Sequence, residues 1–372
     1  MVELEQVKLL QAWVVFGGLL VGLVFGMVCQ VSRYCTIGAI SDLQLMGNGQ
    51  RMRLWLLSIV VAVFLVQLFV QFSLINDEDS FYTSPRLLWL SNVMGGLVFG
   101  VGMALASGCG SRNLIRIGEG SLKALVVFLV MGIAAFATLR GLTAVWRSQT
   151  VDRIYIDLPS RQDLPSLLEG LTGLNSETGR GLVLVVFFGL VFWALLKGLP
   201  GRRLTAGQWV AGTVVGLCVA AGWLLTGWFG FILEHPETLE EAYLATNTRG
   251  PESLTFVAPL SYSLELFLYY SDTSQFLSFA VATVIGTVAG AAAAALRSGS
   301  FCWQGFASTQ DLALHLLGAI LMGVGGVVAM GCTIGHGLSG LSMLALGSVV
   351  AIVSIGVGGL LGLHLLQKLS LN

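Results

Sequence analysis

Cysteine and glycine occur together at several points of this 372-residue sequence. Four cysteines each stand at the start of a short segment, and four glycines flank two of them: Cys35, Cys109, Cys302 and Cys332, with Gly108, Gly110, Gly331 and Gly335. A helix start presents unpaired N–H groups and a partial positive charge, so it binds anions, and glycine lets backbone amides approach the ligand. A thiol is polarizable and suits an anion that itself carries sulfur. These residues predict a pathway for a small anion.

Packing is the main alternative, above all for the glycines inside the long helices: Gly100, Gly102, Gly323, Gly325 and Gly326. Small residues let membrane helices pack closely, and a lone membrane cysteine usually acts as a small hydrophobe. We interpret Cys29 and Cys218 in this way, because neither has flanking glycines or a repeated counterpart. Zinc is disfavoured because no C-x-x-C is present and the spacing of Cys29 and Cys35 is wrong for a structural zinc site. We therefore expect no metal and no cofactor.

Two titratable side chains lie beside the cysteine segments. His336 follows Cys332 within GCTIGHGLSG and could donate to an anion or carry a proton. Arg112 follows Cys109 and could attract an anion, although an arginine here is also a common cytoplasmic anchor of a spanning helix. No hydrolase, metalloprotease or nucleotide-binding motif is present, so the sequence predicts a transporter rather than an enzyme.

Membrane helices must position these residues. Hydrophobic residues make up 55% of the chain and charged residues 10%, and the mean hydropathy is +0.85. The net charge of −1 supplies no basic field for nucleic acid. The predicted fold class is an all-α polytopic membrane protein, with residues 1–372 forming a single integral membrane domain in the lipid bilayer. Nine runs have about the 20 apolar residues that a spanning helix needs, and they lie near 10–31, 54–75, 87–107, 122–142, 181–198, 208–232, 276–296, 313–330 and 341–366.

Four cysteine-bearing segments between these runs are too short to span a bilayer. They lie near 35–46, 109–120, 301–311 and 332–340. Irregular backbone at membrane depth survives only inside protein or beside a water-filled cavity. We expect four short helices that enter the membrane without crossing it.

Charge placement predicts the orientation, because cytoplasmic loops collect Lys and Arg. If the nine runs alternate, one side receives most of the basic residues: Arg33, Arg51, Arg53, Arg112, Arg116, Lys123, Lys197, Arg202, Arg203, Arg297 and Lys368. The other side receives the N-terminus, the acidic cluster 76–79 and two polar loops, 143–180 and 233–275, which we interpret as external decoration. The protein is expected in the inner membrane, with a periplasmic N-terminus and a cytoplasmic C-terminus.

An internal repeat divides the chain. GGLVFGVGMALASGC, ending at Cys109, matches GAILMGVGGVVAMGC, ending at Cys332, and a weaker match relates the sequences around Cys35 and Cys302. Pseudo-symmetric halves often build a site near the bilayer midplane, but whether these halves are inverted is open. The expected parts are a first half 1–142, a periplasmic loop 143–180, central helices 181–232, an acidic periplasmic loop 233–275 and a second half 276–372.

Three stretches of the sequence resemble the YeeE/YedE family of sulfur transport proteins: FGMVCQVSRYCTIGAISD at 25–42, GCGSRNLIRIGEGSLKAL at 108–125 and GCTIGHGLSGLSMLALGS at 331–348. The resemblance implies an hourglass-shaped body and uptake of thiosulfate across the inner membrane. It also implies a relay in which Cys35, Cys109 and Cys332 pass thiosulfate along by weak S–H···S contacts. Cys302 has no secure counterpart in the family.

The leading hypothesis is an importer of thiosulfate or a closely related small sulfur-containing anion. One alternative is a membrane sulfurtransferase or redox protein that forms a cysteine persulfide for a small cytoplasmic sulfur-carrier protein, a partner that the resemblance also implies. Another is a transporter of a selenium species, and a third is a membrane subunit without transport activity. The sequence leaves these alternatives open.

Overall fold

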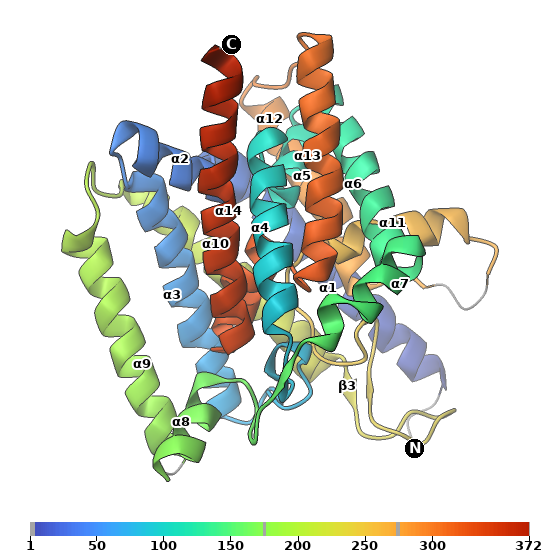
Figure 1. The fold of residues 1–372 in the computed structure, drawn as a ribbon. Helices are drawn as coiled ribbons and strands as arrows, with labels where there is room; N and C mark the ends of the chain where they lie inside the picture. Colours follow the sequence, from blue (N-terminus) through green and yellow to red (C-terminus); the bar gives the residue numbers. More distant parts are fainter. Residues whose placement is uncertain (1–3, 174–175, 273–275, 372) are drawn as a thin grey trace.

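The computed structural model describes residues 4–173, 176–272 and 276–371, and the described chain is a bundle of long helices (Figure 1). The α-helices are α1 (Leu4–Ser32), α2 (Thr36–Met46), α3 (Gln50–Gln71), α4 (Trp89–Leu105), α5 (Gly110–Gly118), α6 (Leu122–Arg140), α7 (Leu142–Gln149), α8 (Leu164–Thr172), α9 (Ser176–Trp193), α10 (Ala206–Leu224), α11 (Ala258–Leu268), α12 (Phe279–Arg297), α13 (Thr309–Val328) and α14 (Leu346–Leu371). The remaining elements are short.

Three of those short elements are π-helices: η3 (Ala194–Gly198), η4 (Leu225–Phe229) and η5 (Gly335–Gly340). Two are 3-10 helices, η1 (Phe81–Thr83) and η2 (Val151–Arg153). Two antiparallel two-stranded ribbons complete the described fold. β1 (Arg86–Leu87) pairs with β2 (Ile156–Asp157), and β3 (Phe231–Ile232) pairs with β4 (Ala242–Tyr243).

Hydroxyl side chains fix the starts of several long helices. Ser121 accepts a hydrogen bond from the amide of Ala124 at the start of α6, and Ser308 accepts one from Asp311 at the start of α13. Thr205 and Gln208 form a capping box at the start of α10. Such caps satisfy amides that a helix end leaves without an intrahelical partner. Local sequence therefore sets where these helices begin.

Eight helical segments of the described chain are long and apolar enough to cross a membrane, which agrees with eight of the nine expected runs. They begin with α1, α3, α4, α6, α10, α12, α13 and α14. The ninth expected run, 181–198, falls on α9 and η3, where the apolar helix Thr178–Trp193 is shorter. A ninth span therefore stays a prediction. Large apolar side chains such as Phe64, Ile133 and Leu361 are exposed on the outer surface, as a lipid-facing surface requires.

The expected short helix at 301–311 is wrong. Residues 301–308 form a loop, and the residues after them begin the long helix α13. The backbone of Gln304 forms a parallel bridge to Ser121, and its carbonyl accepts from the amide of Leu122. Because the loop pairs with the α5–α6 connection, it has no need of a helix to satisfy its backbone groups.

Glycines let several spanning helices approach backbone to backbone. A Cβ placed on Gly26 of α1 would lie 2.1 Å from the Thr287 carbonyl oxygen of α12, and one placed on Gly100 of α4 would lie 2.3 Å from the Ile355 carbonyl oxygen of α14. No residue with a side chain fits at such separations. The packing interpretation of the glycines inside the long helices is therefore correct at these positions.

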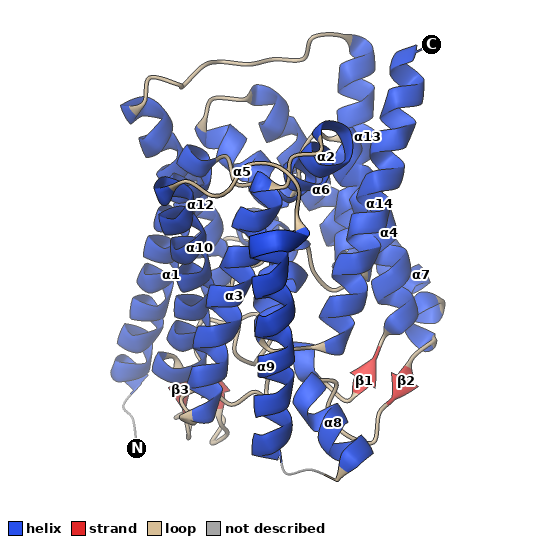
Figure 2. Cartoon of the chain, turned by 90° about the vertical axis from the view of Figure 1, so that its left-hand side faces the viewer, coloured by secondary structure: helices blue, strands red, loops and turns tan. Residues whose placement is uncertain are grey.

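The chain termini lie at opposite ends of the bundle (Figures 1 and 2). The C-terminus, α2 and α5 lie toward one end, whereas the N-terminus, α8 and the two ribbons lie toward the other. We call these the C-terminal end and the N-terminal end of the bundle.

The loop 233–275 is more than external decoration. Residues 250–254 and 256–257 are buried, and Phe256 stacks on Phe25 of α1 with ring centroids 5.3 Å apart. No local sequence feature indicates this burial, because Pro, Glu and Ser in the stretch are typical of an exposed loop. The stretch 250–257 is an irregular segment inside the bundle, and it reaches the cysteines described next.

Candidate functional site

Three long helices end in the same way, and a cysteine follows each end. The residue two positions before the cysteine has a positive φ: Arg33 (53°), Ser107 (55°) and Met330 (64°). The next amide, at Tyr34, Gly108 and Gly331 respectively, donates to the carbonyl five residues earlier. This six-residue closure turns the chain sharply at a helix end. The turn delivers Cys35, Cys109 and Cys332 to the start of a new short helix in each case.

Cys35 and Cys332 share more than this turn. Each begins the sequence Cys-Thr-Ile-Gly, at 35–38 and 332–335. The Sγ of Cys35 accepts a hydrogen bond of 3.4 Å from the Gly38 amide, and the Sγ of Cys332 accepts one of the same length from the Gly335 amide. Each thiol thus caps its own helix. The repeated CTIG sequence was the feature from which this similarity between Cys35 and Cys332 could have been predicted.

Cys109 is held by a different set of contacts. Its side chain is 1% exposed, and its Sγ lies 3.2 Å from the Ser111 hydroxyl. The side-chain amide of Asn113 donates to the carbonyls of Gly108 and Cys109, at 3.1 Å each, and so fixes the turn. Because these groups are buried and mutually bonded, the thiol has a defined position at the start of α5.

Cys35 and Cys332 each lie beside a different cavity. Cys109 is close enough to interact electrostatically with both Cys35 and Cys332. Cys35 lines a cavity of about 550 Å³, which also touches Leu363 and Leu366 near the end of α14. Cys332 lies 3.8 Å from the hydroxyl of Thr255, which lines a second cavity of about 360 Å³ at the end of α13. The cavities therefore lie toward opposite ends of the bundle.

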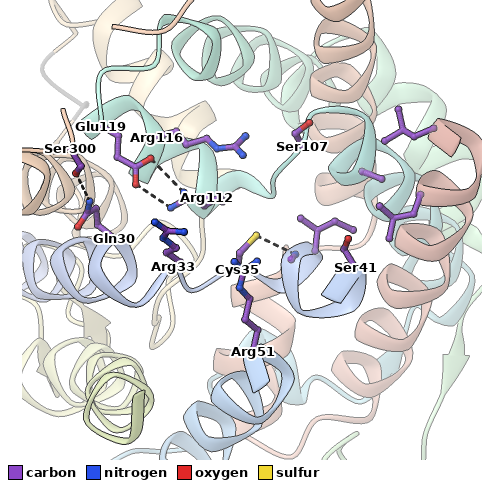
Figure 3. Close-up of a pocket in the computed structure, with 15 residues that line it drawn as sticks. Gln30, Arg33, Cys35, Ser41, Arg51, Ser107, Arg112, Arg116, Glu119 and Ser300 are labelled. Atoms are coloured by element: carbon purple, nitrogen blue, oxygen red, sulfur yellow. Dashed lines mark hydrogen bonds and ion pairs between the residues drawn. The ribbon is translucent and has the colours of Figure 1, made fainter. Parts of the chain in front are cut away.

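The first of these, the arginine cavity, is strongly basic. Its lining includes Arg33, Arg51, Arg112 and Arg116, with Glu119 as an acidic member. Arg112 forms an ion pair of 3.4 Å with Glu119, and both side chains are mostly buried. Figure 3 shows the Cys35 thiol among the side chains of Arg33, Arg51 and Arg112. A cavity with this excess of cations concentrates anions beside the thiol.

The second, the Glu252 cavity, contains both signs of charge. Arg147, Glu252 and Tyr262 line it together with Gly331 and Thr255. Burial raises the pKa of Glu252, although the amides of Asn247 and Thr248 donate to its carboxylate at 2.6 Å and oppose the shift. The buried segment 250–257 thus lines part of this cavity and reaches Cys332 through Thr255.

His336 has no ring nitrogen to spare for a ligand. Its Nδ1 lies 3.0 Å from the Ser348 hydroxyl, and its Nε2 lies 2.6 Å from the Ala329 carbonyl oxygen, to which it donates. The imidazole ring also packs edge-to-face against the ring of Tyr82. Burial lowers the pKa of His336 to about 4, with the Ala329 carbonyl opposing the shift, so the ring is neutral at pH 7. His336 fastens η5 to the ends of α13 and α14.

The four flanking glycines make room for protein atoms. A Cβ on Gly331 would lie 2.8 Å from the His336 ring, and a Cβ on Gly335 would lie 2.8 Å from the Thr255 hydroxyl. Gly108 and Gly110 are less tight, since the nearest atoms would lie at 3.2 Å in Arg112 and at 3.3 Å in Phe256. Their direct contact with an anion stays a prediction.

Cys302 and Cys29 differ in their exposure to solvent and in their distance from the other thiols. Cys302 is exposed on the loop 301–308 and is separate from the buried thiols. Cys29, which the sequence presented as a packing residue, is fully buried and lies within electrostatic range of Cys35 and Cys109. The sequence analysis did not identify Thr255 and Phe256, because no pattern in a polar loop indicates that part of it folds back into the bundle.

Comparison with known proteins decides the family. A family model described as "Sulphur transport" matches residues 31–361, which include Cys35, Cys109 and Cys332. The chain belongs to the sulphur transport family. This agrees with the resemblance of its cysteine motifs to YeeE/YedE proteins.

Two thiosulfate transporters align with nearly the whole chain. Thiosulfate transporter TsuA of Spirochaeta thermophila is 29% identical over 354 residues, covering 92% of this chain and 96% of that protein. Thiosulfate transporter TsuA of Escherichia coli is 26% identical over 362 residues, covering 92% of each. Family membership and the eight helices agree that the chain is a multi-pass membrane protein.

Proposed function

We propose that this chain carries thiosulfate, or a closely related thio-anion, across the inner membrane by passing it from thiol to thiol. The placement of the groups supports the proposal: Cys35 lines the arginine cavity, Cys332 lies beside the Glu252 cavity, and Cys109 is within electrostatic range of both thiols. The names of the two TsuA relatives supply the substrate. In this proposal an anion meets each thiol in turn on its way from one end of the bundle to the other.

Weak contacts suit such a relay better than covalent ones. Burial raises the pKa of Cys332, although the amides of Gly335, Phe256 and Ile334 oppose the shift. The thiol is therefore protonated at pH 7, and an S–H group can donate to the terminal sulfur of thiosulfate. A persulfide-forming enzyme needs a thiolate, which requires the opposite shift of the pKa. This observation favours transport over sulfur transfer at Cys332.

We also infer that the two halves are related by a pseudo-two-fold axis between α4 and α13. The supporting observation is reciprocity: Gly95 approaches Gly325, and Gly102 approaches Gly318, where Gly318 and Gly325 are the repeat counterparts of Gly95 and Gly102. The pairs run in opposite directions along the two helices, so the helices are antiparallel. An inverted repeat of this kind presents equivalent halves to the two sides of a membrane.

The proposed orientation puts the arginine cavity on the cytoplasmic side. Basic residues collect at cytoplasmic ends of spanning helices, and Arg33, Arg51, Arg112 and Arg116 surround this cavity at the C-terminal end of the bundle. The N-terminus and the Glu252 cavity then face the periplasm. Short helices α2 and α5 would enter the membrane from the cytoplasmic side without crossing it.

Uptake by the purified chain tests the proposed function. Proteoliposomes that contain only this protein should accumulate radiolabelled thiosulfate, and a hundredfold excess of sulfate should compete poorly, because sulfate has the same charge but no exposed soft sulfur. Liposomes without protein are the control. Failure of the purified chain to take up thiosulfate above that control, with the protein folded and inserted, would contradict the proposal.

A further inference from the structure

Two buried threonine hydroxyls at equivalent positions are unexplained by the fold. Thr36 follows Cys35 and Thr333 follows Cys332 in the two CTIG sequences. The side chains are 5% and 1% exposed, and within the described residues neither Oγ1 atom has a hydrogen-bond partner. A buried hydroxyl without a partner is destabilising, so its occurrence twice in the same tetrapeptide calls for an explanation.

Other buried threonines of the bundle avoid this penalty. The hydroxyls of Thr226 and Thr287 donate to the carbonyls of Gly222 and Thr283, one helical turn earlier, at 3.1 and 2.7 Å. A threonine that directly follows the capping cysteine has no helical carbonyl one turn earlier, because the chain there has just turned out of the preceding helix. The position therefore leaves the hydroxyl without an intrahelical acceptor.

We propose that Thr36 and Thr333 are ligand-binding residues that act with Cys35 and Cys332. At each position the hydroxyl donates to an oxygen of the anion while the neighbouring thiol contacts its terminal sulfur. The ligand class is a thio-oxyanion with one soft sulfur atom and several oxygen atoms. The proposal rests on the proposed function and adds to it a hydroxyl donor for the oxygen end of the substrate.

Two features of the surroundings support this pairing. The Sγ of each cysteine already accepts from the glycine amide of its own CTIG sequence, which fixes the thiol at the start of the helix that carries the threonine. Cys35 also lines the arginine cavity, whose cations balance the charge of an arriving anion. A thiol alone cannot recognise the oxygen end of such an anion, because sulfur is a weak donor.

Isosteric substitution separates the hydroxyl from the shape of the side chain. We would measure thiosulfate uptake by the full-length protein in proteoliposomes for Thr36→Val, Thr333→Val, Thr36→Ser and Thr333→Ser. Losing one hydrogen bond to a charged ligand should raise the KM about tenfold in each valine variant. The serine variants keep the hydroxyl and should stay within about twofold of the wild-type KM. Thr287→Val is the matched control, because its hydroxyl is bonded within α12, and its KM should be unchanged.

Thermal unfolding in detergent supplies a readout that a structural role would not give. Without thiosulfate, the valine variants should be at least as stable as the wild type, because valine removes an unpaired buried hydroxyl. With thiosulfate, the rise in Tm should be smaller than in the wild type. Wild-type KM and wild-type thiosulfate-dependent Tm shifts in both valine variants would overturn the proposal. In that case Cys109→Ala still reports on the proposed function, because its loss of uptake does not depend on the threonines.

Discussion

Neither Gly95 of α4 nor Gly325 of α13 has room for a side chain, because a Cβ on either residue would lie 2.7 Å from the carbonyl oxygen of the other. The same distance separates a Cβ on Gly102 or Gly318 from the carbonyl oxygen of its opposite glycine. Four glycines thus set how closely the two helices approach. Because the turns at Ser107 and Met330 come two residues after the ends of α4 and α13, the spacing of these helices also positions Cys109 and Cys332.

Adding a methyl group at this contact should destabilise the protein. In Gly95→Ala the new Cβ would meet the Ala329 amide nitrogen at 2.3 Å, so the helices must separate, at a cost of about 1–3 kcal/mol. Gly356→Ala is the control, since a Cβ there meets nothing within 4 Å, and it should be neutral or slightly stabilising. Thermal unfolding in detergent compares the two. Equal Tm values would mean that the glycine contact does not hold the halves together.

Substituting the two members of the Arg112–Glu119 ion pair should change thiosulfate uptake in opposite directions. Arg112→Gln removes a cation from the arginine cavity and leaves Glu119 unpaired, so the KM for thiosulfate should rise roughly tenfold. Glu119→Gln frees Arg112 and should lower the KM, most clearly at low ionic strength, where screening is weakest. A purely structural ion pair would make both variants worse. Uptake kinetics at two salt concentrations decide between these outcomes.

Stability should fall as the pH is lowered from 7 to 5. The pKa of His336 is about 4 in the folded protein, below the ordinary value of roughly 6.5. Between these values the unfolded chain binds a proton that the folded chain excludes, so unfolding becomes easier as the pH falls, by on the order of 2 kcal/mol at pH 5. His336→Gln should show a smaller loss of Tm between pH 7 and pH 5. An identical loss in this variant would assign the pH effect to other groups.

Much of this arrangement was predictable from sequence patterns, and the features that were not predicted have identifiable physical causes. Helix positions follow from apolar length, because a spanning helix satisfies its own backbone groups wherever it packs. The glycine-flanked cysteines were correctly predicted to follow helix ends at Cys109 and Cys332. Their positive-φ turns at Ser107 and Met330 were not, since neither residue type favours that conformation.

Contacts between residues far apart in the chain explain the other features that were not predicted from the sequence. Cys302 was matched with Cys35 by a loose local similarity, whereas the CTIG sequences match Cys35 with Cys332, and the hydrogen bonds of both thiols agree with that pairing. The burial of Phe256 depends on its stacking with Phe25, more than two hundred positions earlier in the chain. A single sequence does not reveal such a contact, because polar neighbours make the local pattern that of an exposed loop.

The proposed orientation can be checked by labelling with a membrane-impermeant thiol reagent. Single cysteines at Glu240 and Arg202, both exposed, would be introduced into a cysteine-free background. Glu240→Cys should react in intact cells with a permeabilised outer membrane, and Arg202→Cys should react only after lysis. Asp77 is unsuitable for this purpose because it pairs with Arg161 and Arg180. The reverse pattern of labelling would invert the topology.

The most direct test of the thiol relay is thiosulfate uptake by Cys109→Ala in proteoliposomes. In the proposed relay Cys109 acts between the other two thiols, and alanine removes its sulfur while leaving a residue that a helix start tolerates. Loss of one weak contact is worth about 1 kcal/mol, or roughly a fivefold effect, whereas a relay with no bypass predicts uptake near the protein-free background. Cys218→Ala, at a buried thiol outside the proposed relay, should transport like the wild type. A folded Cys109→Ala protein with wild-type uptake would contradict the relay.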